Sequence, residues 1–126
     1  VQKACRAGIK RGIIKSAHDV SEGGLAVTLA ECSLTRPNGL MGVKVEIAND
    51  LRADAICFGE GASRIVISVS PKDLDTMLTI AKDLGAKAEV IGAVGGGTIS
   101  MGKVMNAGLV DLYDKWMGAY PEMFGE

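Results

Sequence analysis

The stretch "SAHDVSEGGLA", residues 16–26, places an imidazole, two carboxylates, hydroxyls and two glycines between mostly apolar segments. Residues 14–20, which include the first part of this stretch, have the pattern of a short strand. From Gly24 to Leu34 the apolar residues are almost continuous, which is typical of a buried helix packed between layers. The polar stretch is therefore predicted to be the turn that leads from a strand into a buried helix.

Two interpretations of this turn stay open. In the first, the Ser21 hydroxyl caps the helix, while Gly23 and Gly24 allow a tight turn. In the second, the glycines and the first amides of the helix form an anion site, because a helix N-terminus attracts phosphate. His18 and Asp19 would then face the same cleft. Neither a P-loop lysine nor a GxGxxG pattern accompanies the glycines.

A second polar cluster, "FGEGASR", occupies residues 58–64. Glu60 lies between two glycines, and Arg64 stands at the start of the β-branched run 65–69, which predicts a central strand. The carboxylate and the guanidinium could pair with each other. Alternatively, Glu60 contacts a ligand hydroxyl or ammonium group that the glycine amides approach.

The remaining pattern predicts alternating helices and strands without repeats or linkers. We expect an amphipathic helix at residues 1–13, a turn at 35–39, a strand at 43–47, and one helical turn within 49–63. "SPKDL" predicts a helix start with Ser70 as cap, Pro71 at the first position and Asp73 in the first turn, and Gly85 ends that helix. A strand at 87–94, a glycine turn at 95–97 and a strand at 98–101 read as a hairpin. Residues 109–124 form a closing amphipathic helix.

The composition of the chain limits the classes of protein and partner that fit it. With 126 residues and 48% hydrophobic residues, the chain fits one domain with a real core. The 14 Lys and Arg residues nearly balance the 15 Asp and Glu residues, which argues against nucleic acid or membrane as a partner. Three widely spaced cysteines without a CxxC indicate reduced thiols in a cytoplasmic protein, and no metal site is predicted. The chain opens on Val1 rather than Met, which indicates a piece of a larger protein.

The run "SAHDVSEGGLAVTLAE", followed by "FGEGASRIVISV" and then "VIGAVGGGTI", resembles the C-terminal domain of the aminoimidazole ribonucleotide synthetase superfamily. Within it, the motifs and the tail "LVDLYDKWMGAYPEMF" are most similar to the second, C-terminal copy in the phosphoribosylformylglycinamidine synthase family. The resemblance covers residues 1–126 as one domain. It implies an α+β fold, a layered α/β/α domain with a mixed sheet, packed in the parent against a separate nucleotide-binding domain.

The resemblance also suggests nucleotide-binding residues. The family's first motif matches His18, Asp19, Ser21, Gly23 and Gly24, and its Glu-Ser-x-x-Arg motif matches Glu60 and Arg64. Gly61 and Ala62 replace polar residues that contact the ribonucleotide in the first copy, which favours a structural role or an auxiliary nucleotide site here. The resemblance assigns no catalytic residue and no metal ligand to this chain.

The parent implied by the resemblance is an ATP-dependent carbon–nitrogen ligase of purine biosynthesis. It converts formylglycinamide ribonucleotide to the amidine with ammonia that a glutaminase subunit or domain releases from glutamine. ATP and Mg²⁺ are held mostly by the nucleotide-binding domain, and this chain forms one wall of a nucleotide or phosphate cleft. Two alternatives remain: a domain of another superfamily member (selenophosphate synthetase, thiamine-monophosphate kinase or hydrogenase maturation type), and a non-catalytic binding module.

Overall fold

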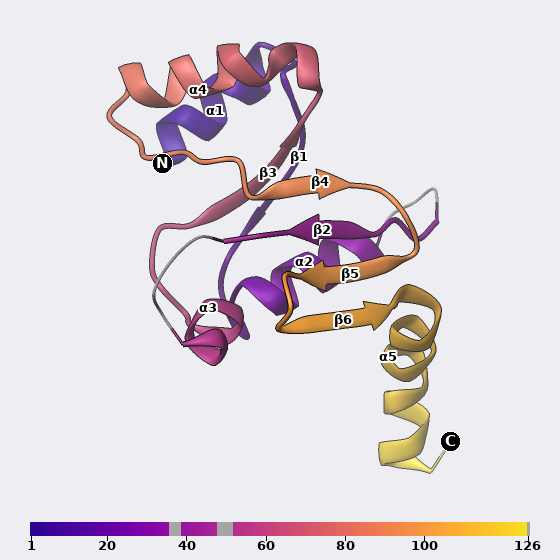
Figure 1. Cartoon of the computed structure of the whole chain (residues 1–126). Coiled ribbons are helices and arrows are strands. Elements are labelled where there is room, and N and C mark those ends of the chain that lie inside the picture. The colour runs from indigo at the N-terminus through magenta and orange to yellow at the C-terminus, as the bar shows by residue number, and fades with distance from the viewer. Residues whose placement is uncertain (36–38, 48–51, 126) are drawn as a thin grey trace. The chain divides into compact units, whose positions relative to one another are not determined.

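The chain forms two compact units, each assembled from two separate segments (Figure 1). The computed structural model describes residues 1–35, 39–47 and 52–125. Unit 1 consists of Val1–Thr28 and Asp54–Val90, and unit 2 of Leu29–Ala53 and Ile91–Glu126. Both units combine helices with strands, and one of the two sheets is mixed, which confirms the predicted α+β class.

Unit 1 contains an antiparallel pair of strands and the helices that pack on it. Its elements are α1 (Gln2–Lys10), β1 (Ile14–Asp19), α3 (Ala53–Phe58), β3 (Ile65–Val69), a 3₁₀ turn (Pro71–Asp73) and α4 (Leu74–Asp83). The helix α2 (Gly24–Leu34) begins in unit 1 and ends in unit 2. The bounds of α2 agree with those predicted for the buried helix.

The core of unit 1 lies where α1 and α4 meet the sheet. The buried side chains Ala4, Ile13, Met77, Ile80 and Ala81 form one cluster, against which Ile67 and Val69 of β3 pack. The predicted apolar stripe of the first helix is only partly buried, because Val1 and Ile9 are about half exposed, at 48% and 53%. The hydrophobic pattern thus located the helix but overstated how much of it is covered.

The prediction that β3 is a central strand is wrong. Among the described residues, β3 pairs only with β1, and every β3 residue is half-buried. Ile67 and Val69 pack into the helix cluster. The apolar run of β3 therefore reflects one face packed against helices, rather than a strand with neighbours on both sides.

The start of α4 uses the predicted residues in a different way. Ser70 has extended backbone angles and Pro71 occupies the first helical position, but the Ser70 side chain makes no capping hydrogen bond. The chain first makes the 3₁₀ turn, so that Asp73 becomes the N-cap of α4, also without a side-chain cap. The contribution of Asp73 is therefore limited to its charge near the positive end of the helix.

We expect Asp73→Ala to lower the free energy of unfolding by only about 0.5 kcal/mol, because a charge near a helix end contributes about this much and no hydrogen bond is lost. Urea denaturation followed by circular dichroism measures the change. Asp83→Ala is the matched control, since Asp83 is the last residue of α4, where a negative charge opposes the helix dipole. That variant should be neutral or slightly more stable. A loss of 2 kcal/mol or more (about the size of a strong side-chain cap) in Asp73→Ala would contradict this account.

Unit 2 contains a four-stranded mixed sheet in the order β4-β2-β5-β6. Its elements are β2 (Val43–Val45), β4 (Gly92–Val94), β5 (Thr98–Met101), β6 (Met105–Gly108) and α5 (Leu109–Phe124). The bounds of β5 and α5 match the predicted ones, whereas the strand predicted at 87–94 is reduced to β4. No strand was predicted for residues 105–108, where β6 lies.

The predicted hairpin between 87–94 and 98–101 is wrong. The strand β2 lies between β4 and β5, antiparallel to the first and parallel to the second. Gly42 explains the arrangement, because its N–H donates to Gly96 O (2.8 Å) and its carbonyl accepts from Gly95 N (2.8 Å). The glycine segment 95–97 therefore forms hydrogen bonds with Gly42, the residue before β2, and does not form the turn of a hairpin.

The core of unit 2 joins α2, the sheet and α5. Leu34, Ile99 and Leu109 are buried together, and Leu112 and Tyr113 of α5 pack against them. No helix in the described part of the chain is long and apolar enough to cross a membrane. The predicted turn at 35–39 and the segment 49–63 fall partly on residues 36–38 and 48–51, which lie outside the described residues.

Candidate functional site

All seven predicted site residues lie in unit 1, at one end of the β1–β3 pair. His18 and Asp19 end β1, and the other five lie in the two adjoining loops or at the start of α2. The register pairs Asp19, the last residue of β1, with Ile65, the first residue of β3. At this end, the glycine turn (residues 20–24) connects β1 to α2, and the acidic loop (residues 59–64) leads into β3. The antiparallel pairing therefore brings together two motifs that are far apart in the sequence.

The two glycine amides of the glycine turn already have acceptors. Gly23 N–H donates to Oε1 of Glu60 at 2.9 Å, and Gly24 N–H donates to the main-chain carbonyl of Ser21 at 3.1 Å. Ser21 thus stabilises the turn through its carbonyl, rather than through the hydroxyl that the sequence suggested as a cap. The Gly23 amide binds a carboxylate, which is the kind of acceptor that a helix N-terminus favours.

Gly24 is held in place by the backbone of Phe58. Its φ is +71°, in the left-handed region. A Cβ at this position would lie 2.6 to 2.9 Å from the C, Cα and O atoms of Phe58, closer than real Cβ atoms come. The close approach predicted for Gly24 is therefore real, and the group that approaches is the chain itself.

The acidic loop is braced from within by Arg64. Its Nη2 donates to the carbonyl of Gly59, and its Nε donates to the carbonyl of Gly61 at 3.3 Å. Glu60 and Arg64 thus bind different partners in the described part of the structure, so their suggested mutual pairing does not occur. The carbonyl of Arg64 also accepts from Val20 N–H at 2.9 Å, which connects this loop to the start of the glycine turn.

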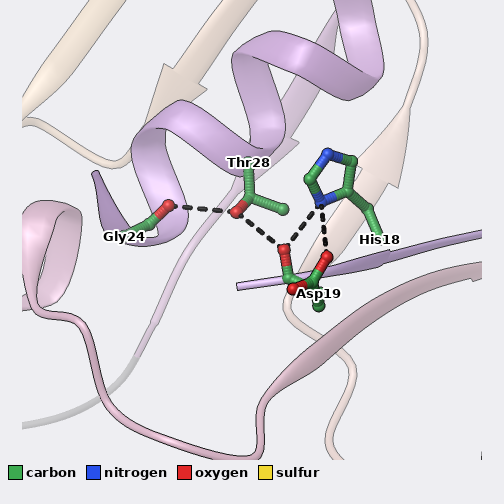
Figure 2. A network of polar contacts seen from close by, with 4 residues as sticks. All are labelled: His18, Asp19, Gly24 and Thr28. Atoms are coloured by element: carbon green, nitrogen blue, oxygen red, sulfur yellow. Dashed lines mark hydrogen bonds and ion pairs between the residues drawn. The ribbon is translucent and has the colours of Figure 1, made fainter. Parts of the chain in front are cut away.

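His18 and Asp19 join a small polar network at the end of β1 (Figure 2). His18 Nδ1 lies 2.7 Å from the Asp19 carbonyl oxygen and 3.8 Å from its Oδ1. The Thr28 hydroxyl donates to the carbonyls of Gly24, at 3.0 Å, and of Asp19, at 3.3 Å. Because a carbonyl only accepts hydrogen bonds, this contact requires a proton on Nδ1. The other ring nitrogen, Nε2, faces away from Asp19 (Figure 2).

Three features of the site were not predicted. Thr28 is buried, at 2% exposure, and connects the start of α2 to the end of β1. A hydroxyl among the apolar residues 25–30 was the available signal. The Phe58 contact has no sequence signal, since it involves only main-chain atoms. Ser63, with φ +61°, takes a left-handed conformation that is uncommon for serine.

Metal binding and thiol chemistry have little support here. Among the described residues, no three His, Cys, Asp or Glu side chains are grouped as a metal site. No disulfide joins Cys5, Cys32 and Cys57. Burial, together with the neighbouring Glu31 carboxylate, raises the pKa of the Cys32 thiol, which keeps it protonated at neutral pH.

Similar proteins were found by sequence and by structure. A relative from Moorella thermoacetica, phosphoribosylformylglycinamidine synthase subunit PurL, is 39% identical over an alignment of 125 positions, which covers 96% of this chain and 17% of the relative. A relative of the same name from Gloeobacter violaceus is 56% identical over 73 residues, 58% of this chain and 9% of its own. The chain thus spans about a sixth or less of the length of these relatives.

A solved structure of Thermotoga maritima PurL complexed with ATP superposes with a TM-score of 0.74 at 19% identity, over 88% of this chain and 20% of that one. This likeness supports the fold. The sequence model of the family described as "AIR synthase related protein, C-terminal domain" matches residues 1–103, which include both site loops. From the motifs, the fold and this match, we conclude that the chain belongs to the family of AIR synthase related proteins, as their C-terminal domain.

Proposed function

We propose that this chain is the second-copy, C-terminal domain of a phosphoribosylformylglycinamidine synthase synthetase subunit. The parent would use ATP and glutamine-derived ammonia to convert formylglycinamide ribonucleotide to formylglycinamidine ribonucleotide in purine biosynthesis. The observation that carries the proposal is the 39% identity to a PurL subunit across 96% of the chain, including α5, which lies beyond the family match at 1–103. In this proposal residues 1–126 form a single domain made of the two units.

The proposed role of the domain is one wall of a nucleotide or phosphate cleft. The wall comprises the side chains or amides of His18, Asp19, Ser21, Gly23, Gly24, Glu60 and Arg64. Two features support it: the Gly23 amide is directed at an anionic acceptor, and the His18 ring is oriented by the Asp19 carbonyl. Solved structures of Thermotoga maritima PurL are complexes with ATP and with FGAR, which makes ATP the cofactor we expect for the parent.

ATP, when bound to the parent, supplies the phosphoryl group that activates the substrate oxygen. The residues of this chain would position phosphate and exclude water, and we assign none of them a catalytic role. As the family resemblance implies, we place most of the Mg²⁺ ligands of the parent on its upstream nucleotide-binding domain. That domain and a glutaminase subunit are the proposed partners, in keeping with the solved PurLQS complex of Thermotoga maritima. We place the parent in the cytoplasm, where purine biosynthesis takes place.

We expect the parent to form ADP, phosphate and formylglycinamidine ribonucleotide from formylglycinamide ribonucleotide, ATP and ammonium chloride, and the 126-residue chain alone to form none. The reason is that this chain provides one wall of the site and lacks the rest. Coupled detection of ADP release, with product identified by mass spectrometry, measures both reactions.

Turnover by the 126-residue chain alone would contradict the division of roles between the domains. A parent that ignored formylglycinamide ribonucleotide and phosphorylated thiamine monophosphate or selenide instead would overturn the proposed function. A chain preparation with native circular dichroism is the control, since an unfolded sample would be inactive for a trivial reason.

A further inference from the structure

Glu60 reaches the glycine turn from 37 residues further along the chain. Its Oε1 accepts the Gly23 N–H at 2.9 Å, although both residues lie near the surface. Gly23 directly precedes α2, and the first amides of a helix have no carbonyl partner within the helix. The Glu60 carboxylate therefore accepts the hydrogen bond of the Gly23 amide, which one interpretation of the sequence gave to a phosphate.

The acidic loop is shaped so that Glu60 stays in this position. Arg64 donates to the carbonyls of Gly59 and Gly61, the two residues that flank Glu60. A guanidinium carries several donors in one rigid plane, so these two hydrogen bonds fix the loop on both sides of the glutamate. The loop also bends through the left-handed Ser63, a conformation that persists only where surrounding contacts hold it.

The two loops are also joined at both ends of their contact. At one end, Val20 N–H donates to the Arg64 carbonyl at 2.9 Å. At the other, the backbone of Phe58 lies so close to Gly24 that no Cβ fits between them. The hydrogen bond from Gly23 to Glu60 therefore lies between these two contacts and adds a third connection between the loops.

From this geometry we propose that Glu60 is a positioning residue, which holds the glycine turn in shape through the Gly23 amide and does not itself contact the nucleotide. Arg64 orients Glu60. The inference rests on the proposed function for the identity of the ligand, and it divides the candidate residues into two groups. Glu60 and Arg64 shape the wall, whereas His18, Asp19 and Ser21 remain to face a ligand. A phosphate can reach the Gly23 amide only when Glu60 leaves it.

Amide hydrogen exchange of Gly23 in the 126-residue chain tests the positioning role directly. We expect Glu60→Ala to speed the exchange of Gly23 at least about tenfold, because its acceptor is lost. Glu60→Gln should stay close to the unmodified chain, since an amide oxygen accepts the same hydrogen bond. Glu22→Ala is the matched control, because it removes a neighbouring carboxylate, whereas the carboxylate that accepts the Gly23 N–H in the described structure is that of Glu60. Unchanged exchange in Glu60→Ala would overturn the proposal.

Inorganic phosphate, titrated while the Gly23 amide shift is followed by NMR, separates this inference from the proposed function. If phosphate and the Glu60 carboxylate compete for the Gly23 amide, the NMR signal of this amide should shift at lower phosphate concentration in Glu60→Ala than in the unmodified chain. If phosphate binds less tightly in Glu60→Ala, the carboxylate does not compete with phosphate for the Gly23 amide, and the proposal fails. If phosphate binds to none of the variants but Gly23 exchange still accelerates in Glu60→Ala, the positioning role stands and the phosphate wall of the proposed function fails.

In the parent enzyme, Glu60→Gln should retain kcat/KM for ATP, while Glu60→Ala lowers it. If Glu60 acted through its negative charge, kcat/KM for ATP would fall equally in the two variants, although the Gly23 amide of Glu60→Gln would still exchange slowly. That result would also overturn the proposal.

Discussion

Replacing Gly24 with alanine should lower the free energy of unfolding by about 2–4 kcal/mol. The left-handed φ of +71° costs a side-chain-bearing residue about 1 kcal/mol, and the new Cβ would press on the Phe58 backbone, which is overpacking of a kind that costs about 1–3 kcal/mol. Urea unfolding followed by circular dichroism at 222 nm measures the change. Gly24→Val should be worse, so loss of ligand binding in that variant would not by itself indicate an anion at the glycine turn.

Gly12→Ala is the matched control for the Gly24 variant. Gly12 has nearly the same φ, +69°, but no atom lies within 4 Å of the position that its Cβ would occupy. Only the backbone term remains, so we expect a loss of about 1 kcal/mol. Equal losses in the two variants would mean that Phe58 does not constrain Gly24, which would contradict the packing of the two loops described above.

Gly42→Ala should destabilise the sheet of unit 2 by about 2–3 kcal/mol. A Cβ on Gly42 would lie 2.3 Å from Thr98 O, 2.7 Å from Gly95 O and 2.9 Å from Gly96 O. These are main-chain atoms, so the strand must move, and the two hydrogen bonds between Gly42 and the glycine segment weaken. The fluorescence of Trp116, the only tryptophan, reports unfolding at α5 of the same unit.

Gly97→Ala serves as the control in the same segment. Nothing lies within 4 Å of the position of its Cβ, and its φ is outside the left-handed range. The variant should be within about 0.5 kcal/mol of the unmodified chain, or slightly more stable because alanine restricts the unfolded state. If Gly42→Ala were equally harmless, the β4-β2-β5 strand order would be wrong.

Sequence patterns predicted helices and strands well where the residues of one segment are enough to determine its structure. The bounds of α2, β5 and α5 follow from apolar periodicity and from the glycines at their ends. The two errors of topology, a central β3 and a hairpin between β4 and β5, concern pairing between distant segments. Nothing near residues 92–101 in the sequence shows that Val43–Val45 inserts between two strands joined by three glycines, so a hairpin was the natural prediction.

The candidate site shows the same division. The two motifs were recognised from the sequence, and strand pairing brings them together as a shared site requires. The direction of each side chain was not predictable: the sequence offered Glu60 two partners, Arg64 or a ligand, and the structure gives it a third, the Gly23 amide. Its choice of the Gly23 amide depends on Arg64 binding carbonyls, a contact that no spacing of residues reveals.

The interleaving of the two units sets an order for their formation during synthesis. Every residue of unit 1 has been made once Val90 has been added, whereas unit 2 then has only its first segment. Its β2 must wait for β4 and β5, which closes a loop of roughly 50 residues, and such distant pairings are slow to form. On the ribosome, unit 1 is therefore able to fold first, with the later part of α2 and the strand β2 exposed until the end of the chain emerges.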